Sequence, residues 1–555
     1  MPKICLILLL SISLPIGIDG SAHAQQTDAP SLSQLLTQAL LSEHHPYLQN
    51  SDLSAEQTVL QQLYQQRNFS PLWFSQDRPT QAALDMLNLL RNAASYGLNA
   101  ADYDGITLTY RLMRLANSAA AQTAQDRTQL ELGLSTAALR FIKHLHYGRI
   151  DPRKVGFNLE TSRDQELDFV DVLIRLSSST DAAAEIAKLE PQSSHYQLLK
   201  KALARYRLLA VDTELTQLPN FTDRSIKPEE FYVGAAALRR LLLAEQDLSS
   251  DAVAADTNSS LDTALVKALQ NYQTRHGLQA DGVLGKQTFS ALTTPFAKRV
   301  QQIELTLERW RWLPPLQSPM IVVNIPQFKL FAFKSANDHE ANLLRMDVIV
   351  GQAFPHTQTP IFLAEMKYVV FRPYWDVPRT ILQREMLDTI ARNPNFLQRN
   401  QLELVNGQSD NSPVVTATPE NIALLASGKL RLRQRPSDSN ALGEVKFIMP
   451  NSYNVYLHST PAKQLFSESH RAFSHGCIRV SDPTALAEYV LRNTATAWSK
   501  DNIQAAMQGE PNQRVNLTQT IPVLIVYSTV MPLESGVVQF FNDIYGHDAK
   551  LAKLL

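Results

Sequence analysis

One cysteine and two histidines near the C-terminal end have the residue types and spacing of a nucleophilic site. Cys477 ends the segment "SHGC", His475 lies two residues before it, and His458 ends the alternating segment "NVYLH" nineteen residues upstream. A thiol attacks as the thiolate, so it needs a base within reach. The alternation predicts a strand, and a strand positions a base more rigidly than a loop neighbour does, which favours His458. Ser459 could orient the imidazole through its hydroxyl or its backbone carbonyl.

The residues around the thiol are suited to hold the reacting groups. Gly476 has no Cβ, so the backbone can turn there and direct the amides near Cys477 at a developing oxyanion. Asp482 followed by Pro483 predicts a helix N-cap with proline at the first helical position. We expect the positive end of that helix dipole to lower the pKa of the thiol.

Other uses of the cysteine stay open on the residues alone. A structural zinc site would need more ligands at metal-ligand spacing, and thiol–disulfide exchange normally uses a CxxC pair, which is absent. The remaining alternative is an inert, buried thiol. We expect no metal and no cofactor.

The first residues predict export of the chain. Residues 1–24 combine Lys3, an apolar stretch and a small-x-small end at Ala22 and Ala24, which is typical of a cleaved signal peptide; an uncleaved anchor is the alternative. Cleavage would remove Cys5, the other of the two cysteines, and leave Cys477 without a disulfide partner. Residues 25–35 are small and polar, and we expect a disordered leader there. The formal net charge of −1 gives no indication of nucleic-acid binding, and no later segment is apolar enough to predict a membrane span.

The pattern along the chain predicts a multidomain α+β protein. Residues 36–250 are mostly helical in pattern and predict a helical scaffold domain, with Met86, Leu87 and Leu90 on one helix face. Residues 318–535 are β-rich and predict a mainly-β domain. An insertion at 376–431 has a helical pattern, including "RTILQREMLDTIA" and an N-cap at Thr418, and is a candidate lid. We expect residues 536–555 to form a helical tail.

Between these regions lies a compact unit at residues 258–296. A helical stripe ends at Gly277, a turn follows at Asp281-Gly282, and a second helix is expected over 286–292. This order of helix, "HGLQADGVLG" and helix resembles the peptidoglycan-binding module of cell-wall enzymes, a small three-helix unit. A generic helical hairpin is the alternative.

The catalytic segments resemble a known enzyme family. His458-Ser459-Thr460, a loop, and then Ser474-His475-Gly476-Cys477 match the signature of the L,D-transpeptidase catalytic domain of the YkuD type. Further stretches are similar to its larger YcbB-like members: "LERWRWLP", "VIVGQAFPHTQTP", "RPYWDVP", "LRQRPSDSNALGEVKFIMPN" and "FFNDIYGHDAKL". One departure is Arg479, where many members carry asparagine.

The resemblance implies a reaction and a set of site residues. Cys477 would attack a peptidoglycan stem peptide, release D-Ala and form a thioester, which a second stem would attack to give a 3–3 cross-link. His458, Ser459, Gly476 and His475 would belong to the catalytic machinery. Ser474, Tyr456, Trp375 and Arg479 would contact substrate, Arg479 by binding a stem-peptide carboxylate. Core packing is the alternative for Tyr456 and Trp375, and a surface ion pair for Arg479.

The acceptor of the thioester stays open. Water would make the protein an L,D-carboxypeptidase, and a lipoprotein lysine would make it an anchoring transpeptidase. An inactive, wall-binding scaffold is a third reading, against which the complete pair of Cys477 and His458 argues. The implied partner is peptidoglycan, with other cell-wall synthesis enzymes as possible further partners, in the periplasm of a Gram-negative cell. Neither nucleic acid nor an integral membrane segment is expected.

Overall fold

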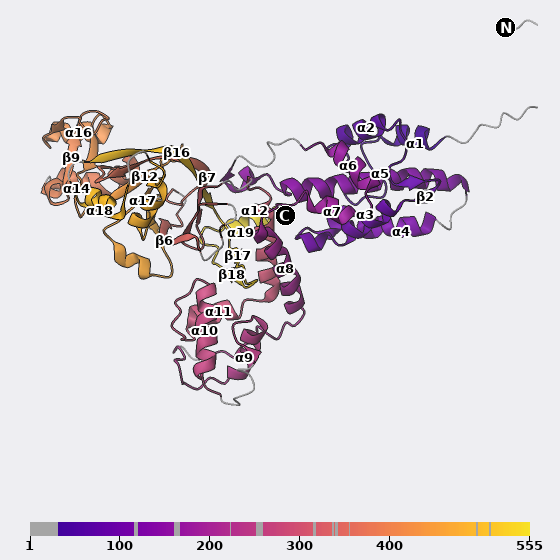
Figure 1. The fold of residues 1–555 in the computed structure, drawn as a ribbon, viewed down its shortest axis with the longest axis horizontal. Helices are drawn as coiled ribbons and strands as arrows, with labels where there is room; N and C mark the ends of the chain where they lie inside the picture. Colours follow the sequence, from indigo (N-terminus) through magenta and orange to yellow (C-terminus); the bar gives the residue numbers. More distant parts are fainter. Residues whose placement is uncertain are drawn as a thin grey trace, which may run out of the picture.

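The computed structural model describes residues 31–115, 120–159, 167–221, 224–250, 259–314, 318–335, 338, 342–354, 356–393, 395–494, 498–509 and 512–555. The expected signal peptide at 1–24 and the first part of the expected leader lie outside these residues. Figure 1 shows a helical lobe at one end of the molecule, the capping insertion at the other end, and a second helical group that projects between them.

The N-terminal helical lobe has its own hydrophobic core. On α3, Met86, Leu87 and Leu90 are buried as their spacing predicts. The first helix begins at Leu32 with a capping box on Ser31, so the end of the expected leader is ordered instead of disordered. The lobe contains α1 (Leu32–Ala39), α2 (Gln57–Gln66), β1 (Phe74–Ser75), β2 (Arg78–Pro79), α3 (Gln81–Arg91), α4 (Gly105–Leu115), α5 (Ala120–Tyr147), α6 (Phe169–Ser178) and α7 (Ala182–Ala187), with 3-10 turns at Ala93–Tyr96 and Ala100–Tyr103.

A second helical group has a separate core, so residues 36–250 do not form the single helical unit that the sequence predicted. The core of the first lobe ends at Leu189, and residues from Tyr196 onward pack with the module and with the C-terminal hairpin. Sequence periodicity reports that a helix is amphipathic but not which core it faces. The group comprises α8 (Ser194–Leu209), α9 (Ala235–Ala244), α10 (Thr263–Arg275), α11 (Lys286–Leu292) and α12 (Phe296–Trp310).

The predicted module lies within this group. Gly277 follows α10 with φ +64°, and α11 covers the residues expected for the second helix. The helix that completes a three-helix unit is α9, which precedes the expected boundary at 258 and shares its core with α10.

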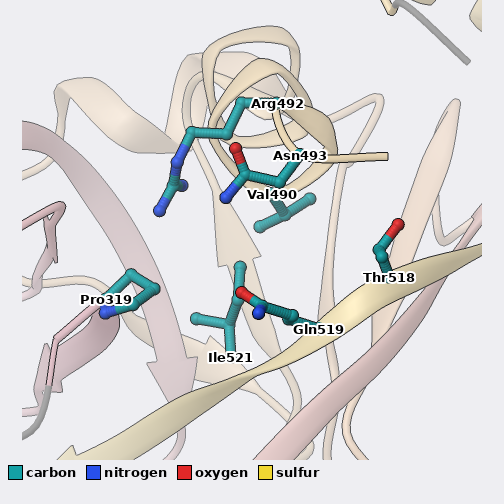
Figure 2. Close-up of a pocket in the computed structure, with 7 residues that line it drawn as sticks. All are labelled: Pro319, Val490, Arg492, Asn493, Thr518, Gln519 and Ile521. Carbon is teal, nitrogen blue, oxygen red and sulfur yellow. The ribbon is translucent and has the colours of Figure 1, made fainter. Parts of the chain in front are cut away.

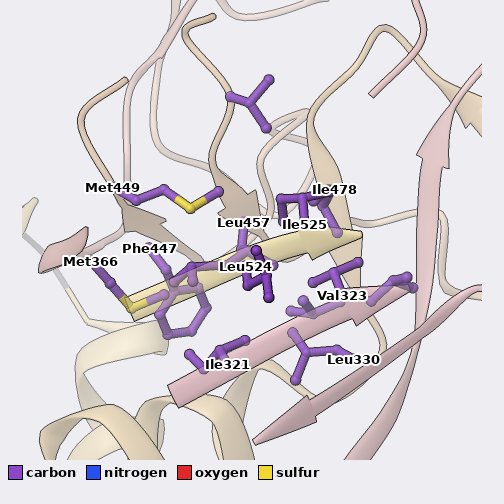
Figure 3. Close-up of a cluster of buried hydrophobic side chains, with 14 of the residues drawn as sticks. Ile321, Val323, Leu330, Met366, Phe447, Met449, Leu457, Ile478, Leu524 and Ile525 are labelled. Atoms are coloured by element: carbon purple, nitrogen blue, oxygen red, sulfur yellow. The ribbon is translucent and has the colours of Figure 1, made fainter. Parts of the chain in front are cut away.

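The β-rich region forms one sheet that closes on itself. Its strands run in the order β12-β13-β15-β6-β5-β4-β16-β7-β3, β14 pairs with β6, and β12 also pairs with β7. The core inside is apolar, with aliphatic, aromatic and methionine side chains, and Figure 3 shows Ile321, Val323, Leu457 and Ile478 converging there. The strands are β3 (Phe157–Asn158), β4 (Met320–Asn324), β5 (Lys329–Phe333), β6 (Leu344–Gly351), β7 (Ile361–Phe371), β12 (Val445–Ile448), β13 (Leu457–His458), β14 (Ala472–Ser474), β15 (Ile478–Val480) and β16 (Gln513–Val526). Helices α17 (Pro483–Leu491) and α18 (Lys500–Gln508) and a 3-10 turn at Lys463–Ser467 accompany them.

One strand of this sheet comes from the helical half of the chain. After the 3-10 turn Pro152–Val155, β3 pairs in parallel with the start of β7, Phe157 opposite Ile361. Asn158 then donates a hydrogen bond of 2.7 Å from its side-chain amide to the Tyr453 hydroxyl. The segment "HYGRIDPRKVGF" (146–157) therefore joins the lobe to the sheet.

The capping insertion contains the expected helices together with a small sheet that the sequence pattern did not predict. Its four-stranded sheet has the order β10-β9-β11-β8, and a small apolar core lies beneath it. The N-cap predicted at Thr418 is confirmed, since its side chain accepts from the Asn421 amide. Its elements are β8 (Trp375–Asp376), α13 (Arg379–Ile381), a π-helical turn (Leu382–Met386), α14 (Leu387–Arg392), α15 (Asn395–Arg399), β9 (Leu402–Val405), β10 (Val414–Val415), α16 (Pro419–Ser427) and β11 (Arg431–Gln434).

The C-terminal tail is also not purely helical. β17 (Val530–Pro532) and β18 (Val538–Phe540) form a hairpin that shares the core of the second helical group, and α19 (His547–Ala552) follows. Asp548 of α19 accepts a hydrogen bond of 2.5 Å from Arg309 of α12.

A buried ion pair joins α12 to the helical lobe. The Glu308 carboxylate accepts from Arg311 at 3.0 Å and from the backbone amide of Ile150 at 3.0 Å. Arg311 in turn donates to the Tyr196 hydroxyl at 3.2 Å. These hydrogen bonds hold together the end of α12, the segment at Ile150 and the start of α8 at Tyr196, which are far apart in sequence.

Of the helices in the described ranges, none has both the length and the apolar character of a membrane span.

Candidate active site

The predicted catalytic side chains lie on one face of adjacent strands. β13 and β15 pair in parallel, with Leu457 opposite Ile478 and His458 opposite Arg479. Leu457 and Ile478 point into the core of the sheet. Because side chains alternate along a strand, Tyr456, His458 and Arg479 point to the opposite face, together with Cys477. The fold therefore brings together four residues that are up to 23 positions apart.

His458 is held in the tautomer that a base requires. The side chain is 4% exposed, and its Nδ1 lies 2.5 Å from the backbone carbonyl oxygen of Ser459. A carbonyl can only accept, so Nδ1 carries the proton and Nε2 is left as an acceptor. Burial, followed by the positive charge of Arg479, lowers the pKa of His458 to about 3. The imidazole is therefore neutral at physiological pH.

The Cys477 thiol is partly buried and its pKa lies above its ordinary value. Burial raises this pKa most, whereas hydrogen bonds from Tyr456 and the positive charge of Arg479 lower it. The Sγ atom lies 3.8 Å from the backbone oxygen of Asn454. Helix α17 does begin at Pro483 with Asp482 as its N-cap, as predicted. The net shift of the thiol pKa is nevertheless upward, because burial outweighs the groups that lower it.

No hydrogen bond joins His458 to Cys477 among the contacts of the described residues. His458 lies opposite Arg479 in the register, and Cys477 precedes Arg479 by two residues, so the His458 and Cys477 side chains are diagonal neighbours on the same face. Catalytic hydrogen bonds are often long before substrate binds, so this geometry agrees with proton transfer that starts on substrate binding.

The turn before the cysteine depends on Gly476 and Ser474. Gly476 has φ +116°, a conformation that residues with a Cβ rarely adopt. Its carbonyl accepts from Thr359 at 2.8 Å, and its amide donates to the Ser474 hydroxyl at 3.1 Å. The same hydroxyl donates to the Cys477 carbonyl at 2.5 Å. The Gly476 amide, expected to serve an oxyanion, is thus already engaged, and Ser474 is a buried structural contact of the turn.

His475 points toward the capping insertion. Its Nε2 lies 2.7 Å from a carboxylate oxygen of Glu385, which belongs to the π-helical turn. This exposed contact connects the catalytic loop to the insertion.

Trp375 lies on β8 and packs against the core of the insertion, as the core-packing alternative proposed.

Arg479 is not placed in the surface ion pair considered as its alternative. No carboxylate lies within ion-pair distance of it in the described ranges, and its Nε atom is buried without a hydrogen-bond partner. Burial lowers the pKa of its guanidinium, whereas the thiol raises it. Its charge is therefore directed at the sulfur and at the base.

Sequence reasoning missed Lys446 and Glu385. Lys446 pairs with His458 across β12 and β13, between Val445 and Phe447, which face the core. The alternation in "EVKFI" could have identified a polar face, but not the strand beside it. Nothing in the sequence around Glu385 indicates its contact with the loop.

Two cavities lie away from the catalytic residues. Figure 2 shows a small pocket between the end of α17 and β16, lined by Arg492, Asn493 and Thr518 among others, with room for about one water (about 10 Å³). A larger cavity of about 1540 Å³ separates α10 and α11 from β4, β5 and the C-terminal hairpin. Within the described ranges, no three His, Cys, Asp or Glu side chains are grouped to hold a metal ion.

Three known families match consecutive parts of the chain. Residues 58–203 match a scaffold domain, residues 237–292 a "Putative peptidoglycan binding domain", and residues 318–504 the L,D-transpeptidase catalytic domain of the YkuD family. The second match begins at 237 and so includes all but the first two residues of α9, in agreement with the core that α9 shares with α10.

One relative and one solved structure show partial similarity to this chain. A protein of Haemophilus influenzae named "Putative L,D-transpeptidase" is 27% identical over 294 residues, which are 52% of this chain and 58% of the relative. The alignment thus spans less than two thirds of that protein. A solved L,D-transpeptidase structure from Xylanimonas cellulosilytica is 12% identical, covers 56% of this chain and all of its own, and has a TM-score of 0.17. From the family matches and the signature residues, residues 318–504 form an L,D-transpeptidase catalytic domain of the YkuD family, in a chain that also contains a peptidoglycan-binding domain.

Proposed function

We propose that this protein is a periplasmic L,D-transpeptidase that forms 3–3 cross-links in peptidoglycan. The observation that carries the proposal is the neutral His458, fixed by the Ser459 carbonyl on the strand beside Cys477. One face of the sheet carries the nucleophile Cys477, the neutral base His458 and the cation Arg479. This set is suited to acyl transfer through a thioester.

In the first half-reaction Cys477 is acylated. His458 Nε2 takes the thiol proton as the sulfur attacks the carbonyl between the third stem residue, typically diaminopimelate, and the terminal D-Ala. The tetrahedral oxyanion needs a hydrogen-bond donor, for which the Cys477 amide is proposed because Ser474 engages that of Gly476. The C–N bond then breaks, the imidazolium protonates the leaving amine, and D-Ala departs from the thioester.

In the second half-reaction the side-chain amine of another diaminopimelate attacks the thioester. His458 accepts the amine proton, the C–S bond breaks, and the proton passes to the sulfur to restore the thiol. Arg479 is proposed to bind a carboxylate of the stem peptide, since its guanidinium has no carboxylate partner among the described residues. The Glu385–His475 contact would hold the insertion over the bound stem.

The test uses tetrapeptide-bearing muropeptides and mass spectrometry. We expect loss of D-Ala, a new dimer, and an adduct with a carbapenem, all absent from Cys477→Ala. His458→Gln should release no D-Ala and form no dimer. His470→Gln changes an exposed histidine in the loop between His458 and Cys477 and should keep both products. An active Cys477→Ala would refute the mechanism. Tripeptide monomer without dimer would identify an L,D-carboxypeptidase instead.

A further inference from the structure

A second cation lies on the catalytic face, beside the base. Lys446 of β12 is directly opposite His458 of β13, and His458 is directly opposite Arg479 of β15. Directly paired residues of neighbouring strands point to the same side of a sheet. Lys446 and Arg479 therefore flank the imidazole, about 10 Å apart at their Cα atoms, two strand spacings.

The Lys446 ammonium has hydrogen-bonding capacity to spare. It donates to the backbone oxygen of Tyr374 at 3.2 Å, and an ammonium has three donors. In the part of the chain that the structure describes, no carboxylate lies within ion-pair distance of it. The acidic groups that act on its charge belong to the insertion, Asp376 and Asp410, and Asp376 is paired with Arg431.

A partly buried, unpaired ammonium is costly to keep in a fold. The cost is offset when an anionic ligand occupies the site, and a stem peptide carries several free carboxylates. We propose that Lys446 is a specificity-determining residue that binds a carboxylate of the donor stem peptide, on the side of His458 opposite to Arg479. This inference rests on the proposed function, because it takes the stem peptide as the donor.

The test compares donors that differ by one charge. Tetrapeptide donors with each carboxylate amidated in turn are given to the wild type and to Lys446→Gln, and D-Ala release is measured. We expect Lys446→Gln to lower kcat/KM about ten- to hundredfold on the unmodified donor. For one amidated donor this penalty should disappear, because that carboxylate is the partner of Lys446. Lys446→Arg should restore much of the activity.

Controls separate charge recognition from structure. Lys463→Gln removes an exposed ammonium from the same domain and should leave every rate unchanged. A purely structural role for Lys446 would give the same penalty on all donors, and this result would overturn the inference. Wild type that releases no D-Ala from any donor would instead refute the proposed function.

Equilibrium binding gives an answer that does not depend on turnover. In a Cys477→Ala background, Lys446→Gln should weaken binding of the unmodified donor about ten- to hundredfold. Binding of the donor in which the carboxylate bound by Lys446 is amidated should stay unchanged. Equal weakening for all donors, or none for any, would overturn the inference.

Discussion

Replacing Arg479 by glutamine should raise the pKa of the Cys477 thiol by about one further unit. The two residues lie two positions apart at the start of β15, so their Cα atoms are about 7 Å apart and their side chains share a face. Two unit charges at about 7 Å in an effective dielectric constant of about 20 interact by roughly 2 kcal/mol. Screening by water at this partly buried position reduces the value to about 1.4 kcal/mol, or one pKa unit.

The assay is the pH dependence of alkylation of Cys477 by iodoacetamide, with the modified peptide quantified by mass spectrometry. The thiolate is the reacting form, so the midpoint of the rate profile reports the pKa of the thiol. Arg479→Lys keeps the charge and should follow the wild type. Arg492→Gln removes one positive charge from an exposed position of the same domain and should not move the midpoint. An unchanged midpoint in Arg479→Gln, or equal shifts in the glutamine and lysine variants, would refute the electrostatic argument.

Three further predictions concern stability and backbone geometry. Glu308→Ala leaves the buried Arg311 without its carboxylate and should cost about 3–5 kcal/mol, on the order of 10 °C in Tm; a loss below about 1 kcal/mol would contradict the proposed junction. Gly476→Ala meets no clash under 3.6 Å but must adopt φ +116°, so thioester formation should be lost while circular dichroism stays native; full activity would contradict the prediction. Burial lowers the pKa values of His144 and His458 to about 3, and protons then favour the unfolded chain below its histidine pKa of about 6.5. Each histidine should therefore cost about 2 kcal/mol of stability between pH 7 and pH 5, and equal Tm values at the two pH values would contradict this.

Local signals in the sequence predicted the parts of the site that depend on neighbouring residues. The strand that ends at His458, the N-caps at Asp482 and Thr418, and the need for glycine at 476 all follow from a few adjacent residues. Capping and backbone conformation are decided within one turn of chain, so a single sequence carries them.

Contacts between distant segments were not predictable in the same way. The register that places Lys446 against His458 depends on how β12 and β13 align. A shift by one residue would turn the Lys446 side chain from the catalytic face to the core face of the sheet. The contact of His475 with Glu385 joins residues 90 positions apart through a π-helical turn that periodicity cannot indicate. The division of the helical half into two cores depends on packing partners that the pattern does not name.

The strand β3 has a consequence for the order in which the fold can be completed during synthesis. β3 emerges about 200 residues before its partner Ile361, so its backbone groups must wait for the sheet to form. The hydrogen bond from Arg149, which lies shortly before β3, to the backbone oxygen of Leu555 forms later still, because the two residues are 406 positions apart. The Asn158–Tyr453 hydrogen bond joins residues 295 positions apart, and Tyr453 directly precedes Asn454, whose backbone oxygen lies 3.8 Å from the thiol. The segment at Tyr453 and Asn454, beside the thiol, would thus acquire this support late, when most of the chain has already left the ribosome.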